Sequence, residues 1–153
     1  MHSWFECKIR YDKTMENGLE KKVTEPYIVD ALSFTEAEAR IIEEQTPFIN
    51  GEYTVSDIKR LNFSEIFKSR KEKDDRYFKA KLNFISLDEK SGKEKKTATN
   101  VLVQAADLRV AVKYIDENMK GSMADYIISS VTETAYMDVY EYKAGGNDEF
   151  GQK

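Results

Sequence analysis

Residues 5–11 read FECKIRY, and residues 78–84 read FKAKLNF. The apolar positions of the two stretches are Phe5, Cys7, Ile9 and Tyr11 in the first, and Phe78, Ala80, Leu82 and Phe84 in the second. Charged or polar side chains stand between them. Such an alternation is typical of a strand that buries one face, because successive side chains point to opposite sides of a sheet. Each stretch therefore predicts a strand, and the second echoes the first.

The echo continues after each of these strands. The turn signals Asn17-Gly18 and Ser91-Gly92 follow, and apolar segments at 23–31 and 97–105 come next. Glycine in such a pair supplies the backbone conformation that a tight turn needs. Each half of the chain therefore predicts a β-hairpin.

Helix signals follow both hairpins. Ser33 stands three residues before Glu36, which is the spacing of a capping box, and Asp107 stands at the equivalent place in the second half. The strand-like segments 52–67 and 125–140 come last, and the alternation of each slips near its middle, around 57–60 and 130–133. One extra residue exchanges the two faces of a strand, so a bulge or bend is expected in each segment.

The ordered recurrence predicts a tandem duplication of a ββαβ unit, with repeats at about 1–70 and about 74–143. A unit of this size buries little core by itself, so two units are expected to complete each other. We expect an α+β protein in which 1–143 form a single pseudo-twofold domain. Its sheet should be mostly antiparallel with two helices on one face, and 144–153 should form a flexible tail.

Charge is distributed unevenly along the 153 residues. The net charge is −4, but residues 59–96 carry 13 basic and 7 acidic side chains, a net +6. Residues 1–58 carry 6 basic and 12 acidic side chains, a net −6. An acidic average therefore leaves room for a local surface that binds anions.

The inventory of catalytic side chains is small. His2 is the only histidine and Cys7 the only cysteine, and Cys7 falls on the predicted buried face. A histidine-based triad, a zinc site or a disulfide is not expected from one residue of each type. The chain contains no phosphate-binding glycine loop of known type. We expect no catalytic residue, metal or cofactor, and an enzyme ranks behind two binding functions.

Basic residues gather where the predicted repeats meet and on the outward face of the predicted first strands. The candidate nucleic-acid or anion-binding residues are Lys8, Arg10, Lys68, Arg70, Lys71, Lys73, Lys79 and Lys81. Cations beside an aromatic side chain can follow a phosphate backbone while bases stack. A solvated linker explains the same residues, because the acidic side chains of Glu72, Asp74 and Asp75 are interspersed among them.

Tyrosines form a second candidate surface near the C-terminus. Tyr136, Tyr140 and Tyr142 occur within YMDVYEY, and aromatic rows of this kind are common at interfaces. Packing of a half-buried strand is the alternative. The row leaves a homodimer open.

The chain resembles an uncharacterised domain-of-unknown-function family found in Bacteroidota and in their phages and mobile elements. The segments that carry the resemblance are WFECK at 4–8, KVTEPYIVDALSFTEAEARI at 22–41 and GEYTVSDIK at 51–59. The resemblance extends over essentially the whole chain and brings no catalytic residues. It implies a setting among genes for DNA handling or host takeover.

Two functions are therefore expected. The first is a non-enzymatic binding protein of phage or mobile-element type, an accessory to nucleic-acid processing that uses the basic surface between the repeats. The alternative is a counter-defence or regulatory protein that binds a host protein or a small nucleotide signal. No apolar run is long enough to cross a membrane, and a cytoplasmic location is expected.

Overall fold

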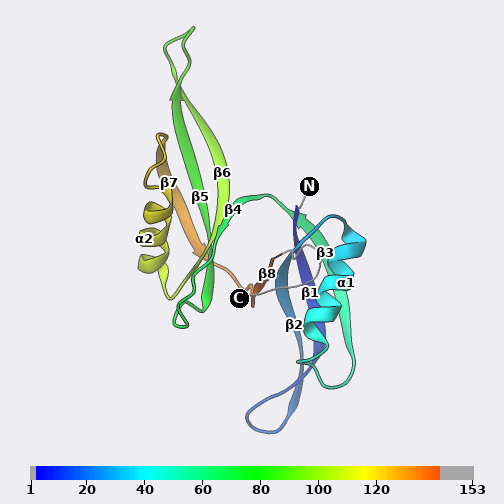
Figure 1. Cartoon of the computed structure of the whole chain (residues 1–153). Helices are drawn as coiled ribbons and strands as arrows, with labels where there is room; N and C mark the ends of the chain where they lie inside the picture. Colours follow the sequence, from blue (N-terminus) through cyan, green and yellow to red (C-terminus); the bar gives the residue numbers. More distant parts are fainter. Residues whose placement is uncertain (1–2, 142–153) are drawn as a thin grey trace, which may run out of the picture. The chain divides into compact units, whose positions relative to one another are not determined.

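The computed structural model describes residues 3–141 and shows an α+β fold with two helices and two four-stranded sheets (Figure 1). The chain divides into two compact units. Of the described residues, unit 1 comprises 3–61 together with 136–141, and unit 2 comprises Asn62–Ala135. Each unit contains one sheet and one helix.

The sheet of unit 1 has the strand order β3-β1-β2-β8. Its elements are β1 (Ser3–Thr14), β2 (Glu20–Ala31), α1 (Phe34–Gln45), β3 (Tyr53–Leu61) and β8 (Val139–Tyr140). All neighbours are antiparallel except β8, which runs parallel to β2. Helix α1 packs on one face, where Ala37 and Ile41 meet the fully buried side chains of Phe5, Cys7 and Ile9.

The sheet of unit 2 has the strand order β4-β6-β5-β7. Its elements are β4 (Phe63–Phe67), β5 (Arg76–Leu87), β6 (Glu94–Ala105), α2 (Leu108–Met119) and β7 (Asp125–Glu133). The strands are antiparallel except β4, which runs parallel to β6. Ala111 and Ile115 of α2 cover Phe78, Ala80 and Leu82.

The predicted hairpins and helix starts are confirmed. Strand β1 pairs with β2 and β5 with β6 along their whole lengths. The Ser33 hydroxyl accepts a hydrogen bond from the Glu36 amide at 3.1 Å, and the Asp107 carboxylate accepts one from the Val110 amide at 2.9 Å. These caps pair amides that lack partners inside the helix.

The predicted irregularities in the last strand of each half are also present. The register of β3 with β1 shifts so that Ser56 is an extra residue, and the register of β7 with β5 shifts so that Ser129 is extra. Both positions lie just before the intervals where the apolar alternation slips. A single inserted residue is enough to exchange the two faces of a strand.

The predicted single sheet is replaced by two sheets, each with its own helix. The expected segment 52–67 breaks at Asn62 into β3, in unit 1, and β4, which pairs in unit 2. The expected segment 125–140 likewise ends as β7 in unit 2 and resumes as β8 in unit 1. Each sheet is thus completed by a short parallel strand from the other half of the sequence. The single domain over 1–143 and the repeat boundaries near 70 and 74 stay predictions, and the tail 144–153 lies outside the described residues.

Pro26 shows how β2 accommodates a residue that has no amide hydrogen. The Pro26 carbonyl accepts a hydrogen bond from the Met137 amide at 2.9 Å, and the Ile28 amide donates to the Asp138 carbonyl at 3.0 Å. Pro26 therefore directs its backbone polar groups toward the short strand β8 and away from β1. The ladder with β1 loses no donor at this position.

Candidate anion-binding site

A small pocket lies in unit 2 between the connector that follows β4 and the exposed side of α2. Its volume is about 210 Å³, and its lining residues are Phe67, Lys68, Ser69, Arg70, Lys71, Tyr114 and Asn118. Tyr114 and Asn118 are four residues apart on α2, so they share one face of the helix. The pocket therefore combines three basic side chains with two aromatic rings and polar groups.

Hydrogen bonds to Gln104 of β6 hold the connector. The Gln104 side-chain oxygen accepts from the Ser69 amide at 2.9 Å, and its Nε2 donates to the Asp74 carbonyl at 2.9 Å. The Ser69 hydroxyl oxygen accepts from the Lys71 amide at 3.1 Å. A connector with this many specific partners differs from the solvated linker that its composition suggests.

Asp74 is the buried centre of this arrangement. It is 1% exposed, and its Oδ2 accepts hydrogen bonds from the Ser69 hydroxyl at 2.5 Å and from the Tyr114 hydroxyl at 2.7 Å. Burial alone would raise the pKa of this carboxyl, but the bonds from Ser69 and Tyr114, together with the charge of Lys71, lower its pKa below the ordinary value. Asp74 is therefore a stable carboxylate that positions two lining residues.

The basic side chains of the pocket are exposed around its rim. Lys68, Arg70 and Lys71 each present a charged group to solvent, and the Lys71 ammonium lies 5.9 Å from the centre of the Tyr114 ring. Exposed cations of this kind attract a phosphate mainly by a Coulomb interaction that salt screens. The same ring offers a surface on which a base can stack.

The structure brings only part of the predicted basic set to this pocket. Lys68, Arg70 and Lys71 line it, whereas Lys73 is an exposed residue of the same connector. Lys79 and Lys81 are exposed on β5, but they alternate with residues that pack under α2 and so lie on the opposite face of the sheet.

Lys8 and Arg10 belong to unit 1. They alternate with Cys7 and Ile9, which pack under α1, and so lie on the sheet face opposite the helix. Lys8 is half-buried and Arg10 is exposed.

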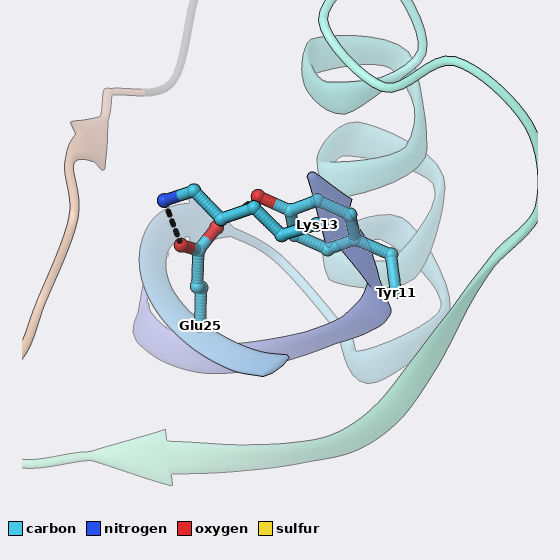
Figure 2. Close-up of polar contacts among 3 residues, drawn as sticks. All are labelled: Tyr11, Lys13 and Glu25. Carbon is cyan, nitrogen blue, oxygen red and sulfur yellow. Dashed lines mark hydrogen bonds and ion pairs between the residues drawn. The ribbon is translucent and has the colours of Figure 1, made fainter. Parts of the chain in front are cut away.

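Close to Arg10, unit 1 pairs a cation with an acid. Glu25 of β2 contacts two side chains of β1 (Figure 2). It accepts a hydrogen bond from the Tyr11 hydroxyl at 2.9 Å, and it forms an ion pair with Lys13 at 3.5 Å. Burial, followed by the hydrogen bond to Glu25, raises the pKa of Tyr11 to about 12. The charge of Lys13 is thus shared with a carboxylate.

The predicted tyrosine row does not form one exposed surface within the described residues. Tyr140 stacks on Tyr27 with ring centres 5.9 Å apart and accepts a hydrogen bond from Gln45 at 3.0 Å. Tyr136 is half-buried, and burial followed by the charge of Glu6 raises its pKa. Tyr142 lies outside the described residues.

Cys7 occupies the core position that the alternation predicts. It is fully buried, and burial together with the charges of Glu6 and Glu38 raises the pKa of its thiol to about 12. A thiol with this pKa is protonated at neutral pH and is a poor nucleophile. Cys7 therefore acts as a small apolar side chain.

Six residues of the pocket and its hydrogen-bond network were missed from the sequence: Phe67, Ser69, Asp74, Gln104, Tyr114 and Asn118. Asp74 resembles any other acid in a charged connector, and nothing local marks it as buried. Gln104 offers the one usable signal, since a polar residue in the apolar run VLVQA needs a specific partner.

Residues 3–141 contain neither a cluster of metal-ligating side chains nor a membrane-crossing helix. No group of three or more histidine, cysteine or acidic side chains there is arranged to hold a metal ion. Neither helix in that range combines the length and apolar character that a membrane crossing requires.

Sequence comparison identifies the family. No curated protein matches the chain. A family model described as a domain of unknown function, DUF4494, matches residues 3–142, which include both sheets, both helices and every lining residue of the pocket. The chain therefore belongs to the DUF4494 family.

Proposed function

We propose that this protein is a non-enzymatic binding protein that holds phosphate groups of a nucleic acid at the basic pocket of unit 2. The proposal places it in the cytoplasm of cells that carry the corresponding phage or mobile element, as an accessory to nucleic-acid processing. The observation that carries the proposal is the convergence of Lys68, Arg70 and Lys71 on one hollow with Tyr114.

The arrangement suits phosphate because three cations line the pocket and the acid that supports it, Asp74, is buried. The Oδ2 atom of Asp74 accepts hydrogen bonds from the hydroxyls of Ser69 and Tyr114, and the side chain is buried. An approaching phosphate therefore meets the basic side chains first. Exposed cations of this kind supply the sequence-independent part of nucleic-acid affinity.

Binding is a better account of the pocket than catalysis. The hydroxyls of Ser69 and Tyr114 both donate hydrogen bonds to Asp74. The lowered pKa of Asp74 makes it a weak base at neutral pH. A general base needs a pKa closer to the working pH. The three residues therefore serve to hold the connector and the Tyr114 ring in place.

We also propose that the two units derive from a duplicated ββαβ segment. Both have a long hairpin, a helix of 12 residues and a third strand of 9 residues, in the same order. The extra residues in the third strands, Ser56 and Ser129, are serines that each stand three residues after a tyrosine, Tyr53 and Tyr126. This correspondence in length, order and bulge position favours an origin by duplication over independent evolution of the two segments.

The experiment is a binding titration with a matched control. The variant Arg70→Glu/Lys71→Glu removes two lining cations, and the control Lys93→Glu/Lys95→Glu makes the same charge change at the turn and start of β6. Fluorescence anisotropy with labelled single-stranded DNA, single-stranded RNA and duplex DNA is measured from about 50 to about 200 mM salt. The pocket variant should lose affinity. The slope of its log binding constant against log salt concentration should become shallower by about two, one for each lost phosphate contact.

The control variant should bind nearly as the wild type does, with circular dichroism showing that both variants fold. Equal losses in the two variants would mean that net charge alone matters and would refute a site at the pocket. Absence of binding by the wild type at the lowest salt would refute the nucleic-acid function.

The small volume of the pocket favours one second candidate, a small nucleotide signal. A hollow of about 210 Å³ can enclose a phosphate group and part of a base or sugar. Calorimetry separates the two candidates. Tight binding of a free nucleotide together with weak binding of oligonucleotides would favour the nucleotide signal.

A further inference from the structure

Unit 1 completes its sheet with a segment that follows β3 by more than 70 residues. Strand β8 pairs with β2 through Ile28 opposite Val139 and Val29 opposite Tyr140. The Ile28 amide donates to the Asp138 carbonyl, and Val139 is 2% exposed. The edge of β2 at Ile28 and Val29 therefore binds a short parallel strand, and we call this edge the seat.

Side chains of α1 close the seat around residues 137–141. Arg40 donates hydrogen bonds to the carbonyl of Asp30, on β2, and to the carbonyl of Glu141 at 2.7 Å. Gln45 donates to the Tyr140 hydroxyl, whose ring stacks on Tyr27. The seat thus recognises the backbone at one end and an aromatic side chain at the other, which is how sheets bind peptides by strand addition.

The link that leads into the seat is short. The Thr134 amide and hydroxyl both donate to the Tyr77 carbonyl in unit 2, at 2.9 and 2.7 Å. The Met137 amide donates to the Pro26 carbonyl in unit 1. Only Ala135 and Tyr136 therefore lie between residues anchored in different units.

The corresponding strand of unit 2 is attached more extensively. Strand β4 pairs with β6 at four positions, from Phe63 to Phe67, whereas β8 pairs with β2 at two. Fewer backbone hydrogen bonds mean a lower free energy for local opening. Of the two crossing strands, β8 is the one that leaves its seat more readily.

We propose that the seat on unit 1 also accepts residues 136–141 of a second copy of this chain, so that two chains exchange β8 reciprocally in a homodimer. The exchanged segment makes the same hydrogen bonds and the same tyrosine stack whichever copy supplies it. Exchange of an identical element between protomers is a low-cost route to a dimer. High protein concentration favours the dimer because only association depends on concentration.

Cysteine trapping tests the exchange directly. In a Cys7→Ala background, one chain carries Ile28→Cys and another carries Val139→Cys, two positions that face each other across the β2–β8 ladder. The two chains are mixed, unfolded, refolded together at increasing concentration and oxidised. The expected result is a disulfide-linked heterodimer that increases with concentration and also increases when Ala135 is deleted, because a shorter link hinders seating in the same chain.

A single chain with both substitutions, Ile28→Cys/Val139→Cys, reports whether the pair can form the bond and whether the variants fold. At low concentration it should give an oxidised monomer. If that monomer forms but the mixed chains give no heterodimer at any concentration, the exchange is refuted. A wild-type dimer in sedimentation without mixed-chain disulfide would place the dimer contact elsewhere and also overturn the proposal.

Discussion

The two units differ at the seventh residue of their 12-residue helices. In α1 it is Arg40, which donates to backbone carbonyls of Asp30 and Glu141. In α2 it is Tyr114, which donates to the Asp74 carboxylate. The first arrangement holds a strand segment in a seat, and the second borders an open pocket of about 210 Å³.

The same helix position therefore presents a different polar group in each unit. A guanidinium has several donors in a fixed plane and can bridge two carbonyls, which suits a peptide segment. A tyrosine ring is rigid and has one hydroxyl, so once Asp74 holds the hydroxyl the ring itself remains as a surface. Unit 1 thereby holds a strand of this protein, and for unit 2 we propose an external anion as the ligand.

The largest effect should come from the cores, where the units are alike. Ile41→Ala and Ile115→Ala each remove a fully buried side chain from the eighth position of its helix. Each change should lower the free energy of unfolding by about 3 kcal/mol, because it leaves a cavity under the helix. Urea unfolding measures both, and a loss in only one variant would break the equivalence of the two cores.

A smaller effect is expected at the buried acid that unit 2 alone possesses. Asp74→Asn should lower the free energy of unfolding by about 2 kcal/mol, because the hydroxyls of Ser69 and Tyr114 lose a charged acceptor. The control Asp75→Asn changes the same charge at the exposed neighbour and should alter stability by less than about 0.5 kcal/mol. Equal effects of the two changes would show that charge, and not the network, matters.

The same variant has a pH signature. The pKa of Asp74 is lower in the folded chain than its ordinary value, so its contribution is fully present above about pH 4 and is lost as the pH falls through the lower folded value. Urea unfolding of the wild type should therefore weaken below about pH 4 more steeply than that of Asp74→Asn. Parallel pH profiles would contradict the assigned pKa direction.

The smallest effect is expected at the half-buried acid of unit 1, Glu25. Tyr11→Phe removes the hydroxyl that donates to Glu25 but leaves the ion pair with Lys13 (Figure 2). A loss of about 1 kcal/mol in urea unfolding is expected, since the net contribution of one hydrogen bond is small and Glu25 keeps its ion pair. A loss as large as that of Asp74→Asn would show that the two acids contribute alike.

Local patterns predicted most of the secondary structure and little of the candidate site. The hairpins, both N-caps and both bulges followed from side-chain alternation and from residues that pair backbone groups within a few positions. Lys68, Arg70 and Lys71 were predicted from charge density. Asp74 and Tyr114 were not, because a hydrogen bond between residues 40 positions apart leaves no periodic trace in the sequence.

What the sequence alone determined is therefore the order and character of the elements, together with the buried place of Cys7. The tertiary fold adds that β4 pairs with β6 in unit 2 and β8 with β2 in unit 1, so that two sheets form where one was expected. The physical reason is that strand pairing uses backbone hydrogen bonds, which every non-proline residue can form. Alternation indicates which face of a strand is buried, but the edge that a strand joins depends on contacts distant in the chain.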